Sequence, residues 1–179
     1  SGRINLDGTG YAPVGDVRVE SGKPLDGALR IELQRALTVA DRANNAVLQE
    51  RDGRWTVQGD PTEAALVVAA RKAGLADEKL DARFERVGEV PFSSERKLMS
   101  TVHSDAEQKE HLLVFTKGAP DVLVARCSQE MVGETKHPLG DERRSEILRL
   151  NEGLAGEALR TLGVAARELP GNALQNTEV

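Results

Sequence analysis

The sequence predicts an α+β fold in which an antiparallel β-sheet is flanked by helices. Residues 86–92, 97–103 and 110–117 read as strands, and the short polar segments between them suit turns and not crossover helices. Helical patterns are grouped before and after these strands, as in α+β domains. A chain of 179 residues is long enough for one substantial core. We therefore predict a single domain over residues 1–179 and disfavour a parallel nucleotide-binding sheet.

The N-terminal part is predicted to contain a short strand followed by a helix. Residues 16–20 alternate between polar and apolar side chains, which indicates a strand. Asp26 is placed to cap the helix that follows. The apolar residues of this helix recur at helical spacing, and they are Leu29, Leu33, Ala36, Leu37 and Ala40.

A tight hairpin and a second helix come next. Residues 46–50 and 54–58 read as strands on either side of Arg51-Asp52-Gly53, and an Asp-Gly pair in that place strongly favours a tight turn. The pair Asp60-Pro61 supplies a cap and a first residue for a helix. Because residues 64–73 are rich in alanine, valine and leucine, we expect this helix to lie near the core.

Two further helices and a last strand are predicted after the meander. Pro120 opens a short helix that runs through Arg126, and Asp141 opens a longer one. Residues 159–166 are predicted to return as a strand. One face of the longer helix carries the apolar residues Ile147, Leu150 and Leu154.

Composition restricts the classes of partner. The 24 basic and 29 acidic residues give a net charge of -5 and are interspersed, so nucleic acid is not an expected partner. No apolar run approaches the roughly 18 to 20 residues that cross a bilayer, so we expect no direct membrane contact. Cys127 is the single cysteine, which fits a reducing, cytosolic setting. The initial Ser1-Gly2 resembles a scar of tag removal, which predicts an excised fragment.

Two lysines are candidate anion ligands. The second and third predicted strands form a hairpin that places Lys97 and Lys117 opposite or diagonal to each other. Like charges destabilise a strand pair, so this arrangement favours an acidic neighbour or an anionic ligand such as phosphate. A solvated sheet edge is the alternative interpretation. Gly118 lets a ligand approach the backbone closely, or else simply forms the corner before Pro120.

An aromatic ring and an acid complete the set of candidates. Phe92 lies just before Lys97, where stacking on a purine would contribute roughly 1 to 3 kcal/mol. An ordinary core phenylalanine is the alternative. Glu63 is the third residue of its predicted helix, where an acid by itself serves to satisfy backbone amides.

Other chemistries are disfavoured. His103 and His111 are symmetric about the predicted hairpin, but no third histidine or cysteine is near them, so we assign no metal site. The sequence contains no GxxxxGK[ST] loop, GxGxxG turn or GxSxG elbow. The residues alone therefore predict an anion-binding α+β domain.

Four segments together resemble the cytoplasmic nucleotide-binding domain of P-type ATPases. They are GDPTEAAL at 59–66, PFSSERKLMS at 91–100, FTKGAPD at 115–121 and ALRTLGVA at 158–165, in matching order and approximate spacing. Weaker similarity at GYAPVGDV and ADRANNAVL extends the resemblance over nearly the whole chain. The chain most resembles the calcium-pump-like class of cation transporters from bacteria.

The resemblance implies that ATP is the ligand, as Mg-ATP in the intact pump. Phe92 resembles the aromatic residue that stacks on adenine, and Glu63 resembles the acid that accepts a hydrogen bond from the exocyclic amine. Lys97 and Lys117 resemble the two lysines of the pocket, and Arg160 resembles the arginine that steadies the polyphosphate. The implied ATP-binding residues are Glu63, Phe92, Lys97, Lys117, Gly118 and Arg160.

The chain also departs from the family pattern. Ser94 stands where calcium pumps of animal cells have an arginine, so one cationic contact to the nucleotide is lost. The Asp-Lys-Thr-Gly-Thr motif, whose aspartate is phosphorylated, is absent from the sequence, as are the magnesium-binding aspartates. The resemblance therefore implies a monomeric fragment that binds ATP without hydrolysing it. Its expected partners are the phosphorylation and actuator domains of the parent chain, at the cytoplasmic face of the cell membrane.

Two alternatives remain open at this point. One is a free-standing module that senses ATP in regulation, and the other is an interaction domain whose site has degenerated at Ser94. Flanking membrane segments with the phosphorylation motif would favour the pump. An ATP titration without localised shifts would favour the interaction domain.

Overall fold

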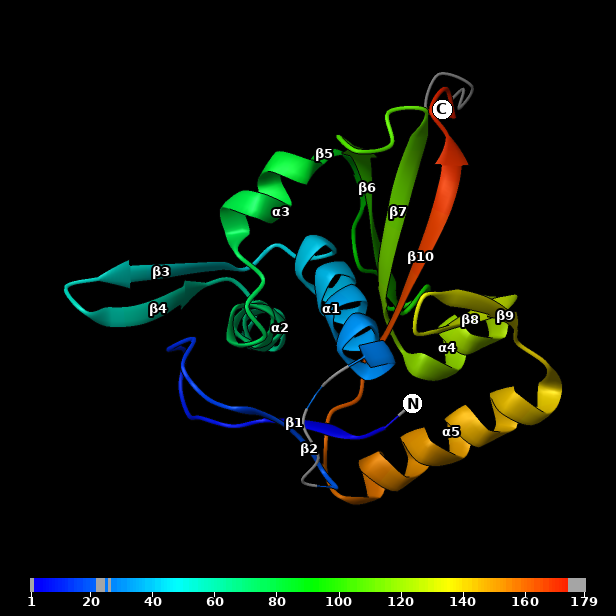
Figure 1. Cartoon of the computed structure of the whole chain (residues 1–179), viewed down its shortest axis with the longest axis horizontal. Coiled ribbons are helices and arrows are strands. Elements are labelled where there is room, and N and C mark those ends of the chain that lie inside the picture. The colour runs from blue at the N-terminus through cyan, green and yellow to red at the C-terminus, as the bar shows by residue number, and fades with distance from the viewer. Residues whose placement is uncertain (1, 22–24, 26, 174–179) are drawn as a thin grey trace. The chain divides into compact units, whose positions relative to one another are not determined.

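The structure is a computed structural model of the chain, and it describes residues 2–21, 25 and 27–173. These residues divide into two compact units. The first takes in the chain up to Ala82 together with Val132–Glu134. The second takes in Arg83–Met131 and the chain from Thr135 onward. Figure 1 labels the elements of both units.

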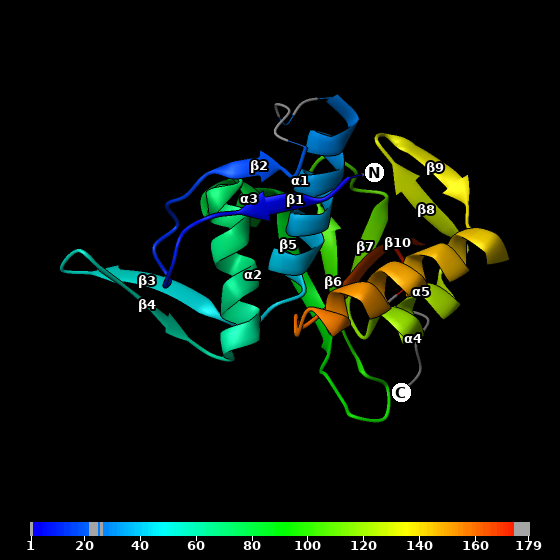
Figure 2. The same cartoon turned by 90° about the horizontal axis from the view of Figure 1, so that it is seen from below.

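The first unit combines antiparallel strand pairs with helices. Its elements are β1 (Ile4–Leu6), β2 (Val17–Val19), α1 (Gly27–Arg42), β3 (Val47–Arg51), β4 (Arg54–Gln58), α2 (Pro61–Lys72) and α3 (Asp77–Arg83), whose last residue belongs to the second unit. Strand β1 pairs with β2, and β3 pairs with β4. Helices α1 and α2 lie side by side (Figure 2). Their buried apolar side chains are Leu37, Val39, Ala40, Ala64, Val67, Val68 and Ala70.

Local sequence signals set the turn and the cap in this unit. Asp52 and Gly53 have φ of 52° and 72°, the left-handed conformation that a two-residue hairpin turn needs at both central positions. The Asp60 carboxylate accepts hydrogen bonds from the backbone nitrogens of Thr62 and Glu63, which confirms the predicted cap of α2. The cap predicted at Asp26 lies outside the described residues.

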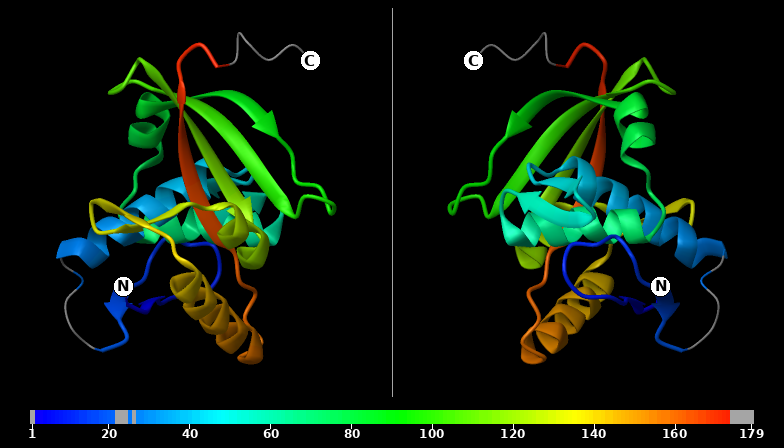
Figure 3. Two further views of the ribbon diagram at one scale, coloured as in Figure 1. Left: turned by 90° about the vertical axis from the view of Figure 1, so that its right-hand side faces the viewer. Right: turned by 90° about the vertical axis from the view of Figure 1, so that its left-hand side faces the viewer.

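The second unit is built on a four-stranded antiparallel sheet with the order β10-β7-β6-β5. Its elements are β5 (Phe84–Val90), β6 (Leu98–Asp105), β7 (His111–Gly118), α4 (Pro120–Arg126), β8 (Gln129–Val132), whose last residue belongs to the first unit, β9 (Thr135–Pro138), α5 (Asp141–Gly156) and β10 (Gly163–Pro170). The consecutive strands β5, β6 and β7 are the predicted meander (Figure 3). Helix α4 packs against β7 and β10, and α5 packs against α4.

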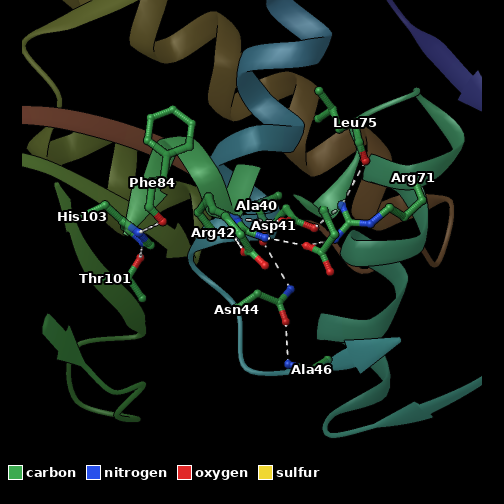
Figure 4. A network of polar contacts seen from close by, with 12 residues as sticks. Ala40, Asp41, Arg42, Asn44, Ala46, Arg71, Leu75, Phe84, Thr101 and His103 are labelled. Atoms are coloured by element: carbon green, nitrogen blue, oxygen red, sulfur yellow. Dashed lines mark hydrogen bonds and ion pairs between the residues drawn. The ribbon is translucent and has the colours of Figure 1, made fainter. Parts of the chain in front are cut away.

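One face of this sheet is closed by aromatic packing. The rings of Phe84 and Phe115 meet edge to face with centroids 5.4 Å apart, and the ring of His103 lies 5.2 Å from that of Phe115. His103 is 2% exposed, and its ring nitrogens lie within hydrogen-bonding distance of the Thr101 hydroxyl and the Phe84 carbonyl (Figure 4). These ring contacts join side chains of β5, β6 and β7 on one face of the sheet.

The last strand differs from its prediction. It begins at Gly163 and not at residue 159, because the ending of α5 extends to Leu159 and a short connection follows it. Ala158 has a φ of 58°, and the backbone nitrogen of Leu159 donates to the carbonyl of Leu154, a left-handed helix ending that needs two further residues. Arg160 consequently lies in the connection before β10.

Sequence patterns missed the shorter elements, β1, α3, β8 and β9. Each has three to seven residues, which is too short for a hydrophobic period to repeat.

Candidate functional site

One end of the four-stranded sheet gathers most of the predicted site residues. Gly118, the last residue of β7, is paired with Leu98 on β6 and with Gly163 on β10. Lys97 comes directly before Leu98, and Arg160 lies three residues before Gly163. Lys97 and Arg160 therefore precede β6 and β10. Both of these strands begin at the end of the sheet where β7 ends.

Phe92 lies at this end as well, in the connection from β5 to β6. The ring is not a core residue, because 60% of its surface is exposed. The connection contains a hydrogen-bonded turn, in which the backbone nitrogen of Lys97 donates to the carbonyl oxygen of Ser93 at 2.7 Å. An exposed phenyl ring and an exposed ammonium group thus flank one tight turn.

Arg96 is a residue of this turn that the sequence analysis did not single out. Its guanidinium donates to the hydroxyl of Ser100 at 3.3 Å and to the carbonyl of Pro91 at 3.5 Å. The Ser100 hydroxyl is in turn 2.9 Å from that of Thr116 on β7. Arg96 therefore ties the residue before Phe92 to the sheet. The signal available in the sequence was its place inside the PFSSERKLMS segment.

The two lysines are diagonal neighbours, which is one of the two arrangements expected. The residue directly opposite Lys117 is Met99, and β6 begins only after Lys97, whose backbone is left-handed with a φ of 56°. The two side chains have different surroundings, because Lys97 is exposed and Lys117 is only 6% exposed. A lysine this deeply buried is uncommon and depends on polar surroundings.

Gly118 has a steric reason to be glycine. A β-carbon there would lie 2.2 Å from the carbonyl oxygen of Lys97 and 2.9 Å from the α-carbon of Leu98. The backbone nitrogen of Ala119 donates to the same Lys97 carbonyl at 3.0 Å. The glycine thus allows β7 to turn into α4 directly against Lys97, and its role toward a ligand stays a prediction.

Glu63 belongs to the first unit, in the first turn of α2. Its carboxylate accepts a hydrogen bond from the backbone nitrogen of Asn45 at 3.2 Å. Its carbonyl oxygen accepts another from the side-chain amide of Asn44 at 2.9 Å. The acid is therefore anchored to the segment between α1 and β3. Its role toward the backbone amides of the helix start stays a prediction.

The histidine pair loses its geometric basis. Leu113, and not His111, is directly opposite His103. The ring nitrogens of His103 are engaged by Thr101 and Phe84, whereas His111 is exposed. Within residues 2–21, 25 and 27–173, no group of three potential metal-ligating side chains is gathered. No helix in this described part of the chain is long and apolar enough to cross a membrane.

Comparison with known families decides the classification. Residues 32–179 match the family described as P-type ATPase, cytoplasmic domain N. The chain belongs to this family. The α+β fold with an antiparallel sheet, and the resemblance that the four sequence segments indicated, are thereby confirmed.

Relatives of this N domain are bacterial proteins named as calcium- or cation-transporting ATPases. The chain is 35% identical over 169 residues to the calcium-transporting ATPase of Bacillus subtilis, covering 90% of this chain and 18% of that protein. It is 36% identical over 162 residues to the probable cation-transporting ATPase F of Mycobacterium bovis, covering 90% and 17%. For a calcium-transporting ATPase of Listeria monocytogenes the identity is 39% over 112 residues, covering 63% and 12%. The chain thus spans less than a fifth of the length of these relatives.

Proposed function

We propose that this N domain binds ATP at the end of its four-stranded sheet and, in a parent cation pump, presents the terminal phosphate to the aspartate of a phosphorylation domain. The observation that carries the proposal is that Phe92 and Lys97 are both exposed in one short connection, at the end of the sheet where Gly118 is the last residue of β7. A flat apolar ring next to cations suits a purine that carries phosphates.

Each residue has a stated role in this proposal. Phe92 stacks on adenine, and Glu63 accepts from the exocyclic amine. Lys97 and Lys117 neutralise charge near the ring and along the phosphate chain, and Arg160 steadies the polyphosphate. Gly118 keeps the backbone beside Lys117 accessible. The ligand is Mg-ATP in the intact pump, and residues 1–179 act as one monomeric domain.

The physical contribution of such a domain is positioning. Phosphoryl transfer gains most of its rate from alignment and charge neutralisation, and neither requires the domain to supply a nucleophile. The partners would be the phosphorylation and actuator domains of the parent, on the cytoplasmic side of the cell membrane. The names of the relatives support a cation as cargo and calcium as its first candidate.

An ATP titration followed by amide chemical shifts tests the binding function. One stacked ring and a few exposed ionic contacts predict an affinity near 1 mM for the isolated chain, or about -4 kcal/mol. Shifts should concentrate at Phe92, Lys97, Lys117 and Gly118, and the amides of the Asp52-Gly53 turn are the internal control. Absence of localised shifts at 10 times that concentration, on the order of 10 mM ATP, would refute the proposal and favour the interaction-domain alternative.

A phosphate-release assay tests the second part of the proposal. The chain should release no phosphate from ATP, because the acceptor aspartate belongs to another domain. Steady release that co-purifies with the chain would contradict this assignment.

A further inference from the structure

We propose that Asn44 is a positioning residue that holds the Glu63 carboxylate for the exocyclic amine of adenine, and so determines selectivity for 6-amino purines. The inference deepens the proposed nucleotide function and rests on it. Asn44 lies in the segment between α1 and β3, and all of its contacts described below are within the first unit.

Asn44 joins three stretches of backbone. Its side-chain nitrogen donates to the carbonyl of Ala40 at 3.2 Å and to the carbonyl of Glu63 at 2.9 Å. Its side-chain oxygen accepts from the backbone nitrogen of Ala46 at 2.8 Å. Figure 4 shows this side chain between Ala40 and Ala46. The residue is 7% exposed, so these bonds are protected from water, and their loss would leave backbone groups unsatisfied.

Glu63 is consequently held twice by the same segment. Asn44 fixes its main chain, and the backbone nitrogen of Asn45 fixes its carboxylate at 3.2 Å. The two bonds come from consecutive residues, so the proposal is that loss of the Asn44 bond also displaces the Asn45 nitrogen from the Glu63 carboxylate. A carboxylate has about four acceptor positions, so the bond from Asn45 is compatible with a further bond to a ligand amine.

The residues just before α2 also pack tightly against the segment between α1 and β3. Gly59, with a φ of 120°, packs so closely that a β-carbon on it would lie 2.9 Å from the α-carbon of Ala46. The segments on either side of Glu63 and Asn44 are thus in direct contact. A glutamate side chain has three rotatable bonds, and holding it in advance removes ordering cost at the moment of binding.

The chemistry of the ligand follows from the group being held. A carboxylate accepts hydrogen bonds and donates none, so it pairs with the 6-amino group of ATP. The 6-oxo group of inosine triphosphate (ITP) is itself an acceptor and would face the same carboxylate unpaired. A misplaced carboxylate should therefore weaken ATP binding and leave ITP binding unchanged.

The test compares ATP and ITP binding in a double-mutant cycle, by chemical-shift titration of the whole chain. Asn44→Ala should weaken ATP about fivefold, the value of one hydrogen bond, without changing the affinity for ITP. The same substitution in a Glu63→Gln background should have no further effect on ATP. Asn45→Ala is the matched control, because it keeps the backbone nitrogen that donates to Glu63. If Asn44→Ala does not fold, Asn44→Asp keeps the shape and the bond to Ala46 but loses both donations, and the same results are expected.

The outcomes separate this inference from the binding function itself. Equal weakening of ATP and ITP, or additive effects of the Asn44 and Glu63 substitutions, would show that Asn44 serves stability alone and would overturn the inference. A native chain that binds both nucleotides equally would overturn it too, while leaving the nucleotide site intact. A native chain that binds neither nucleotide would overturn the proposed function and this inference together.

Discussion

The carbonyl oxygen of Lys97 occupies the space that a β-carbon on Gly118 would need, at a distance of only 2.2 Å. This contact brings the start of β6 and the end of β7 together at the end of the sheet where Phe92 is exposed. It also gives the KGAP segment a reason for its glycine that is independent of any ligand. The integrity of the proposed site therefore depends on a backbone contact as well as on its charged side chains.

Gly118→Ala should destabilise the second unit by about 2 kcal/mol, because Lys97 and Leu98 must move to admit the methyl group. Urea unfolding measures the change. The control is Gly153→Ala in α5, where nothing lies within 4 Å of the added carbon. That substitution should stabilise the chain by roughly 0.5 to 1 kcal/mol, since alanine is the better helix former. Equal effects at both positions would contradict the steric argument.

Phe92→Ala should weaken ATP binding by roughly 5- to 100-fold, which corresponds to the loss of one stacking contact. The unfolding midpoint should hardly change, because the ring is 60% exposed. Val90→Ala removes another exposed apolar side chain nearby in the chain and serves as the control, with ATP affinity unchanged. A folded Phe92→Ala chain with native affinity would remove the ring from the site.

Asp41→Asn should cost about 3 kcal/mol of unfolding free energy in the first unit. The Asp41 carboxylate is 1% exposed and lies 2.6 Å from the Arg42 guanidinium and 3.0 Å from that of Arg71. Neutralising it removes the buried member of this cluster and leaves the two arginines paired with the exposed carboxylates of Asp77 and Asp81. Asp81→Asn is the matched control. Its carboxylate also pairs with Arg42 but is 68% exposed, so a loss below about 1 kcal/mol is expected. Similar losses for both substitutions would show that burial does not matter here.

Cys127 should react slowly with a disulfide reagent at pH 8. Burial raises the pKa of its thiol, and the charge of nearby Arg144 only partly opposes this shift. At this pH the folded chain then holds less of the reactive thiolate than the unfolded chain does. The measurement compares reaction rates with and without urea, using a small free thiol as the reference. Equal rates in both conditions would contradict the prediction.

The single-domain prediction can be tested by following each unit separately during unfolding. Trp55, the only tryptophan, reports on the first unit by fluorescence, and the His103 ring resonance reports on the second. We expect coincident midpoints in urea, because one cooperative domain loses both signals together. Two separate midpoints would mean that the units are independent domains.

The sequence by itself determined the elements whose signals are local. The Asp52-Gly53 turn, the Asp60 cap and the helix starting at Pro120 are each fixed by the conformational preferences of a few neighbouring residues, and each is found where it was predicted. Hairpin geometry and chain position made Lys97, Lys117 and Phe92 site candidates, and motif resemblance added Arg160; neither argument needs coordinates. Short elements such as α3 and β8 lacked a repeating pattern and were missed.

Only the tertiary structure decided which residues support those candidates. The Asn44 bond to Glu63 joins residues 19 positions apart, and the Ser100 contact with Thr116, which continues from Arg96, joins residues 16 positions apart. No local preference encodes such pairs, because they form only after helices pack and strands take up their register. The exposure of Phe92 and the burial of Lys117 have the same origin, since both residues occur in short motifs whose sequence leaves their solvent contact undetermined.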